Sequence, residues 1–291
     1  MTDLDWMRRV EEGMSGGSRW SCQHEHSAHG GHGELVKLDG WHERIPDYPP
    51  VPSHLRAEFE MCVWDWEPML NLRVGTKKYC PQDDIVSECV QTQGVWEGYG
   101  TNLALDILRS DAPGVTIDCG SQIGWYSLLS LSSNRLTLSI DADMETIGLL
   151  RKSVEGNGWL ENWVYCWAGL DADSPVIDAL PADRVRFMKM DIEGAENHAV
   201  RVFEPLLAAH MVDYLMMEVS PCFDDYYPDL CVQLRDQYGL IPHAIPTKGI
   251  ELEAFGSQPL ESILPYRIAD DELAEWVANC VQRDVLFILE N

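Results

Sequence analysis

The segment from Val115 to Asp141 constrains the fold more than any other part of the chain. It reads as an apolar strand, a glycine turn, a helical stretch and a second apolar strand, and Asp118 and Asp141 end the two strands. Gly120 and Gly124 lie in the turn, where glycine lets the backbone bend sharply and a ligand come close. An acid after the second strand can accept hydrogen bonds from a ribose diol. The pattern predicts a nucleoside-containing cofactor at the carboxyl edge of a parallel sheet.

The turn itself favours a cofactor without phosphate. A dinucleotide-binding turn has the pattern G-x-G-x-x-G, whereas this turn reads Gly120-Ser121-Gln122-Ile123-Gly124 and lacks the middle glycine. That glycine lets a pyrophosphate approach the backbone, and Asp118 directly before the turn would repel phosphate. S-adenosylmethionine fits better, because it combines an adenosine with an ammonium and a sulfonium.

Apolar strands alternate with helical stretches from residue 113 onward, which predicts a mostly parallel sheet with helices on both faces. The expected strands are Val115–Asp118, Leu136–Ile140, Trp163–Ala168, Val185–Asp191, Tyr214–Val219, Ile241–Ile245 and Val285–Leu289. The expected helices are Trp125–Ser133, Met144–Gly156, Ala195–His210 and Tyr227–Tyr238. Ligands of such sheets bind beyond the carboxyl ends of the strands. The residues at or near those ends are Asp118, Asp141, Ala168, Asp191 and Glu218.

Composition divides the chain into three parts. Residues 1–50 are rich in Gly, Ser and His and end in a proline-rich linker. Residues 51–112 are expected to cap the core on the substrate side, with a helix and a strand within 55–75 and a helix towards the end of Ile85–Leu108. Residues 113–291 form the expected cofactor-binding domain, which starts after the Pro113-Gly114 break.

A cluster of metal-ligating residue types lies in the first part of the chain. Its members are Cys22, His24, His26, His29 and His32. These ligand types suit zinc, but the spacing matches no structural zinc pattern. Both a metal site and a flexible His-rich tail therefore remain open for this segment.

Charge and composition exclude some partners. The formal net charge is −27, from 48 acidic and 21 basic residues. Nucleic acid and anionic membrane surfaces are disfavoured, because binding them requires Lys and Arg. No apolar run approaches the roughly 20 residues of a membrane span, and no secretory signal is apparent. The nine cysteines are scattered, which suits free thiols in a reducing cytoplasm. The sequence is also compatible with a homo-oligomer.

Several motifs resemble those of FkbM-type, S-adenosylmethionine-dependent methyltransferases. The run from Ile117 to Ser127 is similar to the family's D-x-G-A-N-x-G-x-Y-S motif, and Phe187–Glu196 resembles its K-x-D-x-E-G-x-E signature. An Asn157-Gly158 pair and a Trp96-Glu97 pair follow the family pattern too. The resemblance covers about residues 95–291. The chain departs from it at Ser121-Gln122, where the family usually has Ala-Asn, and at Asp141, where Glu is commoner.

The resemblance implies a Rossmann-like class I methyltransferase fold with a seven-stranded sheet, and it assigns roles to residues. The cofactor-binding set is Glu97, Asp118, Gly120, Ser121, Gln122, Gly124, Asp141, Ala142, Ala168 and Asp191. The candidates for general base or substrate orientation are Asp191, Glu193 and Glu218. The resemblance requires no metal, although the three candidates could form an oxygen site for Mg²⁺. Alternatively, Glu193 and Glu196 could serve the N-terminus of the helix that follows Gly194.

The expected function is O-methylation of a hydroxyl group on a sugar, glycan or other small natural product. One alternative is a methyltransferase-like fold that binds ligands without catalysis, against which the intact Asp118, Asp141 and Asp191 argue. The other is a nicotinamide-dependent oxidoreductase, which the missing middle glycine and the Lys189–Glu196 signature disfavour.

Overall fold

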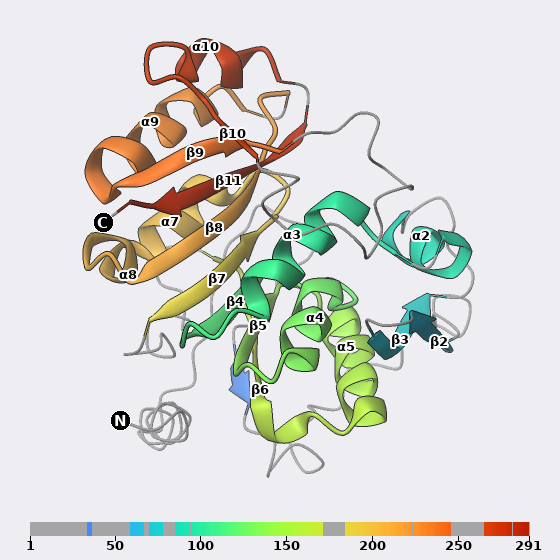
Figure 1. Cartoon of the computed structure of the whole chain (residues 1–291). Coiled ribbons are helices and arrows are strands. Elements are labelled where there is room, and N and C mark those ends of the chain that lie inside the picture. The colour runs from blue at the N-terminus through green and yellow to red at the C-terminus, as the bar shows by residue number, and fades with distance from the viewer. Residues whose placement is uncertain are drawn as a thin grey trace.

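A central sheet with the strand order β1-β6-β5-β4-β7-β8-β11-β9-β10 organises the described part of the chain (Figure 1). The structure, a computed structural model, describes residues 34–36, 59–66, 70–77, 85–93, 95–170, 184–222, 224–245, 265–280 and 282–290. The strands are β1 Glu34–Val36, β4 Val115–Cys119, β5 Thr137–Asp141, β6 Trp163–Trp167, β7 Val185–Met190, β8 Val212–Val219, β9 Leu240–Ala244, β10 Tyr266–Arg267 and β11 Arg283–Leu289.

The centre of the sheet is parallel. Strands β6, β5, β4, β7 and β8 pair in parallel with their neighbours, and β11 inserts antiparallel between β8 and β9. The short strands β1 and β10 extend the two edges antiparallel to β6 and β9. All five residues of β4 are buried, as expected for a parallel strand that is covered on both faces. The predicted α/β, Rossmann-like fold with a mostly parallel sheet is confirmed, and two short strands add to the seven that were expected.

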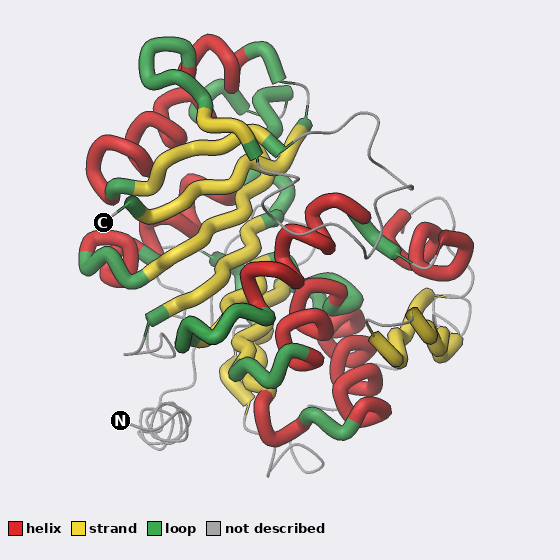
Figure 2. The backbone as a smooth tube through the Cα atoms, viewed as in Figure 1, coloured by secondary structure: helices red, strands yellow, loops and turns green. Residues whose placement is uncertain are grey.

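Helices cover both faces of the sheet, as Figure 2 shows in red against the yellow strands. The helices are α2 Ile85–Gln93, α3 Gly98–Leu108, α4 Trp125–Ser132, α5 Met144–Asn157, α7 Glu196–Val202, α8 Glu204–Ala208, α9 Tyr227–Tyr238 and α10 Leu273–Ala278, with a short 3₁₀ turn at Leu160–Asn162. Local signals delimit α5: the Asp143 side chain accepts a hydrogen bond from the Glu145 N–H, and Gly158 ends the helix with a φ of 78°.

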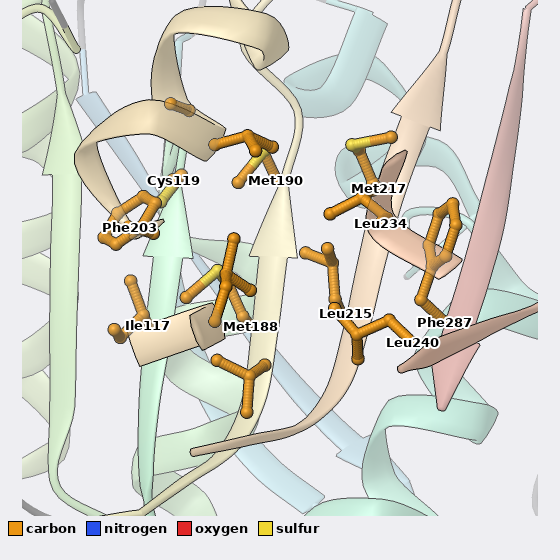
Figure 3. Close-up of a cluster of buried hydrophobic side chains, with 14 of the residues drawn as sticks. Ile117, Cys119, Met188, Met190, Phe203, Leu215, Met217, Leu234, Leu240 and Phe287 are labelled. Carbon is orange, nitrogen blue, oxygen red and sulfur yellow. The ribbon is translucent and has the colours of Figure 1, made fainter. Parts of the chain in front are cut away.

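Two apolar clusters lie on the opposite faces of the sheet. One packs β4, β7 and β8 against the helices from α7 to α10; Figure 3 shows part of it, including Ile117, Met188 and Phe203. The other packs the sheet against α3, α4 and α5 and contains Leu105 and Leu128. Strands β6, β7, β8 and β11 contribute residues to both clusters, because side chains alternate between the two faces of a sheet. The carboxyl ends of β4 to β8 are left between the helical layers.

The structure corrects two local predictions. Within 55–75 the expected helix is wrong, because Phe59–Trp66 (β2) and Leu70–Lys77 (β3) form an antiparallel hairpin. The single helix expected over Ala195–His210 is also wrong: α7 ends at Val202 and α8 begins at Glu204. Pro205 explains the break, because proline has no N–H to donate and its ring would clash with the carbonyl of residue 201.

Other expectations fall partly outside the described residues. Most of the 1–50 segment, including the Cys22–His32 cluster, lies outside them. The six cysteines whose side chains the structure describes are all free thiols, and Cys119, Cys166 and Cys231 are buried. No helix within the described ranges is both long and apolar enough to cross a membrane.

Candidate active site

The carboxyl ends of the parallel strands open into a cavity of about 600 Å³. Its walls come from the loops after β4, β5, β6 and β7, from Glu218 near the end of β8, and from residues of α2 and α4. The cavity lies where a doubly wound sheet binds ligands, and its volume is within the range of small-molecule sites. The fold thus gathers segments that are far apart in the sequence around one pocket.

The glycine turn after β4 packs tightly against the loop after β7. Gly120 has a φ of 77°, and a Cβ at this position would lie 1.7 Å from the carbonyl oxygen of Asp191. The N–H groups of Gly120 and Ser121 both donate to the Ile140 carbonyl, which fixes the turn to β5. Gly124 begins α4 with a φ of 89°, and a Cβ there would lie 2.0 Å from Leu150 of α5. Both glycines are needed for close packing.

Ser121 and Gln122 line the cavity between the two glycines. Gln122 has a φ of 47°, a left-handed conformation that Asn adopts more readily than Gln. Its side-chain Oε1 accepts a hydrogen bond from the Ile123 N–H, so the longer amide supports its own turn. The Ser121 hydroxyl is buried without a hydrogen-bond partner among the described residues. This hydroxyl is therefore available to hydrogen-bond with a ligand in the cavity.

Asp141 at the end of β5 organises the wall next to the turn. Its Oδ2 accepts from the Gln122 N–H at 2.7 Å, and its Oδ1 accepts from the Asp143 N–H at 2.8 Å. Burial raises the pKa of Asp141, and the two backbone hydrogen bonds oppose that shift. Each carboxylate oxygen can accept a second hydrogen bond, so Asp141 can still bind a diol.

Asp118 has a structural partner as well as a place in the cavity wall. Its Oδ2 accepts from the N–H of Ser127 at 2.8 Å and from its hydroxyl at 2.5 Å, which ties β4 to α4. Burial raises the pKa of Asp118 to about 6, and the bonds from Ser127 oppose the shift. Both bonds go to one oxygen, so Oδ1 remains for a ligand.

The same wall continues past the ends of β5 and β6 and includes Ala142 and Ala168. The Ala168 N–H donates to the Asp141 carbonyl. The Trp167 indole donates to the Ala142 carbonyl at 2.9 Å and is only 5% exposed. Trp167 thus packs as part of the protein interior, and the small residues Ala142 and Ala168 form the surface next to the cavity.

Buried hydrogen bonds to Glu196 hold the loop after β7, which carries Asp191 and Glu193. Glu196 is fully buried and accepts hydrogen bonds from the Ile192 N–H, the Tyr227 hydroxyl and the Tyr226 hydroxyl. Glu196 lies in the first turn of α7, but its carboxylate binds the loop before the helix and two tyrosines and makes no capping hydrogen bond to the helix. Glu193 is exposed at the rim and has a φ of 53°. Burial and the nearby Asp191 raise its pKa.

Glu218 near the end of β8 lies on the same side of the cavity as Asp191. Its two carboxylate oxygens accept from the Gln282 amide at 2.8 Å and from the Ser220 hydroxyl at 3.1 Å. Burial and the negative charge of Asp191 raise the pKa of Glu218 to about 7, while Gln282 and Lys189 oppose the shift. A carboxylate with this pKa can take up a proton at neutral pH.

Lys189 is a buried cation that borders this acidic side of the cavity. Its Nζ lies 2.7 Å from Asp284, 3.2 Å from Asp191 and 3.8 Å from Glu97. Burial alone would lower the pKa of Lys189, but Asp284, Glu97 and Asp191 together hold it well above its ordinary value. The Tyr126 ring centroid lies 5.3 Å from the ammonium.

Glu97 precedes α3 in a left-handed conformation, with a φ of 44°. It accepts a hydrogen bond from the Tyr126 hydroxyl at 2.7 Å. Burial, followed by the charge of Asp284, raises the pKa of Glu97 to about 8, while Lys189 and Tyr126 oppose the shift. Native Glu97 therefore binds a proton up to about pH 8, whereas the ordinary value of 4.5 applies after unfolding.

This difference predicts a pH-dependent stability. Between pH 4.5 and 8 the native state holds more protons than the unfolded state at Glu97, so the free energy of unfolding falls as the pH rises. Glu97→Gln is expected to reduce that fall by on the order of 2 kcal/mol between pH 5 and 9. Urea unfolding of both proteins across this pH range measures it. An equally steep fall in the variant would show that Glu97 is ionised throughout.

The structure brings most of the predicted site residues to one cavity. Ten of them line it: Asp118, Gly120, Ser121, Gln122, Asp141, Ala142, Ala168, Asp191, Glu193 and Glu218. Glu97 and Gly124 do not border it. The roles of all twelve residues in binding or catalysis stay predictions.

Sequence reasoning missed other residues of the cavity wall. Among them are Ile85, Val86, Trp96, Tyr126, Lys189 and Gln282. Lys189 and Trp96 lie inside motifs that resemble the family's, which is a usable signal. Gln282 carries no such signal, because it follows the last helix in an unremarkable segment. Within the described ranges, no group of three or more His, Cys, Asp or Glu side chains is arranged to hold a metal ion.

Comparison with known proteins supplies little beyond this geometry. The sequence matches no protein-family model and no curated protein. Similar solved structures include an rRNA methylase from Streptococcus thermophilus, at 10% identity and a TM-score of 0.43 over 68% of this chain and 99% of that one. Precorrin-6y C5,15-methyltransferase from Geobacter metallireducens matches at 14% identity and a TM-score of 0.39, over 65% and 88% of the chains. The bifunctional kinase-methyltransferase WbdD matches at 16% identity and a TM-score of 0.44, over 69% of this chain and 41% of that one.

Proposed function

We propose that the cavity binds S-adenosylmethionine and that the protein transfers the methyl group to a hydroxyl oxygen. The observation that carries the proposal is the meeting of two sets of groups in one cavity. The glycine turn after β4 and Asp141 form one wall, and the carboxylates of Asp191 and Glu218 form another. The first wall suits the adenosine part of the cofactor. The carboxylates of the second wall suit removal of the proton from the acceptor hydroxyl.

The residues of the first wall fit the cofactor. Asp141 would accept hydrogen bonds from the ribose hydroxyls, and Ala142 and Ala168 leave room for the flat adenine ring. The buried Ser121 hydroxyl, which lacks a partner among the described residues, and the free oxygen of Asp118 would bind the amino acid end. When bound, the cofactor supplies an electrophilic methyl group on a sulfonium.

The residues of the second wall would act on the acceptor. A methyl group on sulfonium already carries a good leaving group, so the protein has mainly to align the acceptor and remove its proton. Glu218 would accept that proton, because its pKa of about 7 matches neutral pH. Asp191, held by Lys189, would orient the hydroxyl through its other carboxylate oxygen. Hydroxyl-rich acceptors such as sugars suit a wall of this kind.

Calorimetric titration with S-adenosylhomocysteine, and separately with NAD⁺, tests the proposal. We expect S-adenosylhomocysteine to bind and NAD⁺ not to bind. Asp141→Asn should weaken the binding of S-adenosylhomocysteine at least tenfold, or about 1.4 kcal/mol. Asp213→Asn is the matched control, because Asp213 pairs with Arg184 and Arg186 and does not border the cavity. Thermal unfolding of the Asp141 variant establishes that its turn is intact.

The outcomes separate the alternatives. A folded protein that binds neither compound contradicts the cofactor assignment, and binding of NAD⁺ alone favours an oxidoreductase. If S-adenosylhomocysteine binds but no sugar or polyol in a broad panel is methylated from S-adenosylmethionine, the result favours a non-catalytic module.

A further inference from the structure

We propose that Asp284 and Glu97 are positioning residues: they anchor the Lys189 ammonium, and Lys189 in turn holds the Asp191 carboxylate in place at the cavity. The importance of Asp191 to catalysis rests on the proposed function, whereas the anchoring itself does not. Glu97 is thereby assigned to a place beside the cavity and not to contact with the cofactor.

The register of the sheet explains how residues so distant in sequence meet. Lys189 in β7 lies opposite Met216 in β8, and Asp284 in β11 lies opposite Glu218 in β8. Side chains alternate between the faces of a sheet, so Met216 and Glu218, two residues apart, share one face. Met216 belongs to the apolar cluster under α3, α4 and α5. Lys189, Glu218 and Asp284 therefore project to that face near its carboxyl edge.

The anchoring groups approach Lys189 from outside the cavity wall. Asp284 and Glu97 do not border the cavity, whereas Lys189 and Asp191 do. The Lys189 side chain is only 3% exposed, and a buried ammonium needs close carboxylates to offset its lost hydration. Asp284 at 2.7 Å is the nearest of them, and Glu97, at 3.8 Å, becomes a second charged partner above about pH 8, where it is ionised.

Asp191 depends on this anchored cation. Among the described residues, Lys189 is the one donor to the Asp191 carboxylate, through Oδ2 at 3.2 Å. The backbone of Asp191 is fixed separately, because its N–H donates to the Cys119 carbonyl. If Lys189 lost its anchor, its long flexible side chain would be free to leave Asp191. The loop would stay in place while the carboxylate lost its fixed orientation.

Crystal structures of three variants test this chain of contacts. Asp284→Ala removes the acceptor, and we expect the contact between Lys189 Nζ and Asp191 Oδ2 to be lost. Asp284→Asn keeps an acceptor oxygen, and we expect it to restore the contact. Asp284→Leu, close to aspartate in size and without an acceptor, repeats the first test should the alanine variant fail to fold. Asp213→Ala is the control and should leave the contact unchanged.

Retention of the wild-type contact in the alanine or leucine variant would overturn the proposal. Loss of the contact in Asp213→Ala would also overturn it, because a general effect on stability would then be responsible. S-adenosylhomocysteine should bind all variants within about threefold of the wild-type affinity, since Asp284 does not border the cavity. If wild type does not bind this compound, the proposed function fails, whereas the crystal structures still decide the anchoring.

Discussion

Gly120→Ala is expected to lower the free energy of unfolding by about 3 kcal/mol or more and to abolish binding of S-adenosylhomocysteine. The new Cβ would lie 1.7 Å from the carbonyl oxygen of Asp191, and the φ of 77° disfavours any residue with a Cβ. The obstacle is backbone, so no side-chain rotation relieves it. The ends of β4 and β7 would have to separate, and the cavity lies between them. Urea unfolding and calorimetric titration measure the two effects.

Gly148→Ala is the matched control for this substitution. Gly148 lies inside α5, and a Cβ there would have nothing within 4 Å. Alanine is the better helix former, so this variant should gain about 0.5–1 kcal/mol and bind normally. If Gly120→Ala behaved like the control, the close packing between the glycine turn and Asp191 would be wrong.

Glu218→Gln is expected to lower kcat for methyl transfer by about 10²–10⁴-fold, or roughly 3–5 kcal/mol. The glutamine amide can still form hydrogen bonds with Gln282 and Ser220, but it cannot take the proton from the hydroxyl that is methylated. The wild-type rate should rise with pH through about 7, where burial and Asp191 place the pKa of Glu218. The residual rate of the variant should lack that rise. Initial rates with labelled cofactor, on an acceptor identified from the panel, give both quantities.

Two controls make the Glu218 result specific. The variant should bind S-adenosylhomocysteine within about threefold of wild type, because Glu218 lies on the acceptor side of the cavity. Asp213 lies near the amino end of β8, away from the cavity. Asp213→Asn should therefore keep the full rate and the wild-type pH profile. An undiminished kcat in Glu218→Gln would exclude this residue as the proton acceptor and leave Asp191 as the candidate.

The regular part of the fold was predictable because the sequence repeats one local pattern there. Helix Tyr227–Tyr238 has the predicted bounds, and the ends of the parallel strands differ from prediction by one or two residues. Where that pattern ends, local signals mislead. Residues 59–66 contain Trp, Val and acids that fit a helix or a strand, and pairing with 70–77 decides between them.

One part of the candidate site could likewise be predicted from the sequence, and another part could not. Acids such as Asp141 and Asp191 follow apolar strands, so their meeting at one edge follows from the parallel topology. The ion pair between Lys189 and Asp284 joins residues 95 positions apart across an intervening strand. It depends on β11 lying between β8 and β9, which no local pattern indicates. The same holds for Gln282 beside Glu218.

A crystal structure of the protein with S-adenosylhomocysteine tests the central claim most directly. We expect the ribose hydroxyls to bind Asp141, the adenine to lie beside Ala142 and Ala168, and the sulfur to face Asp191 and Glu218. Binding in another place, or with the ribose away from Asp141, would contradict it.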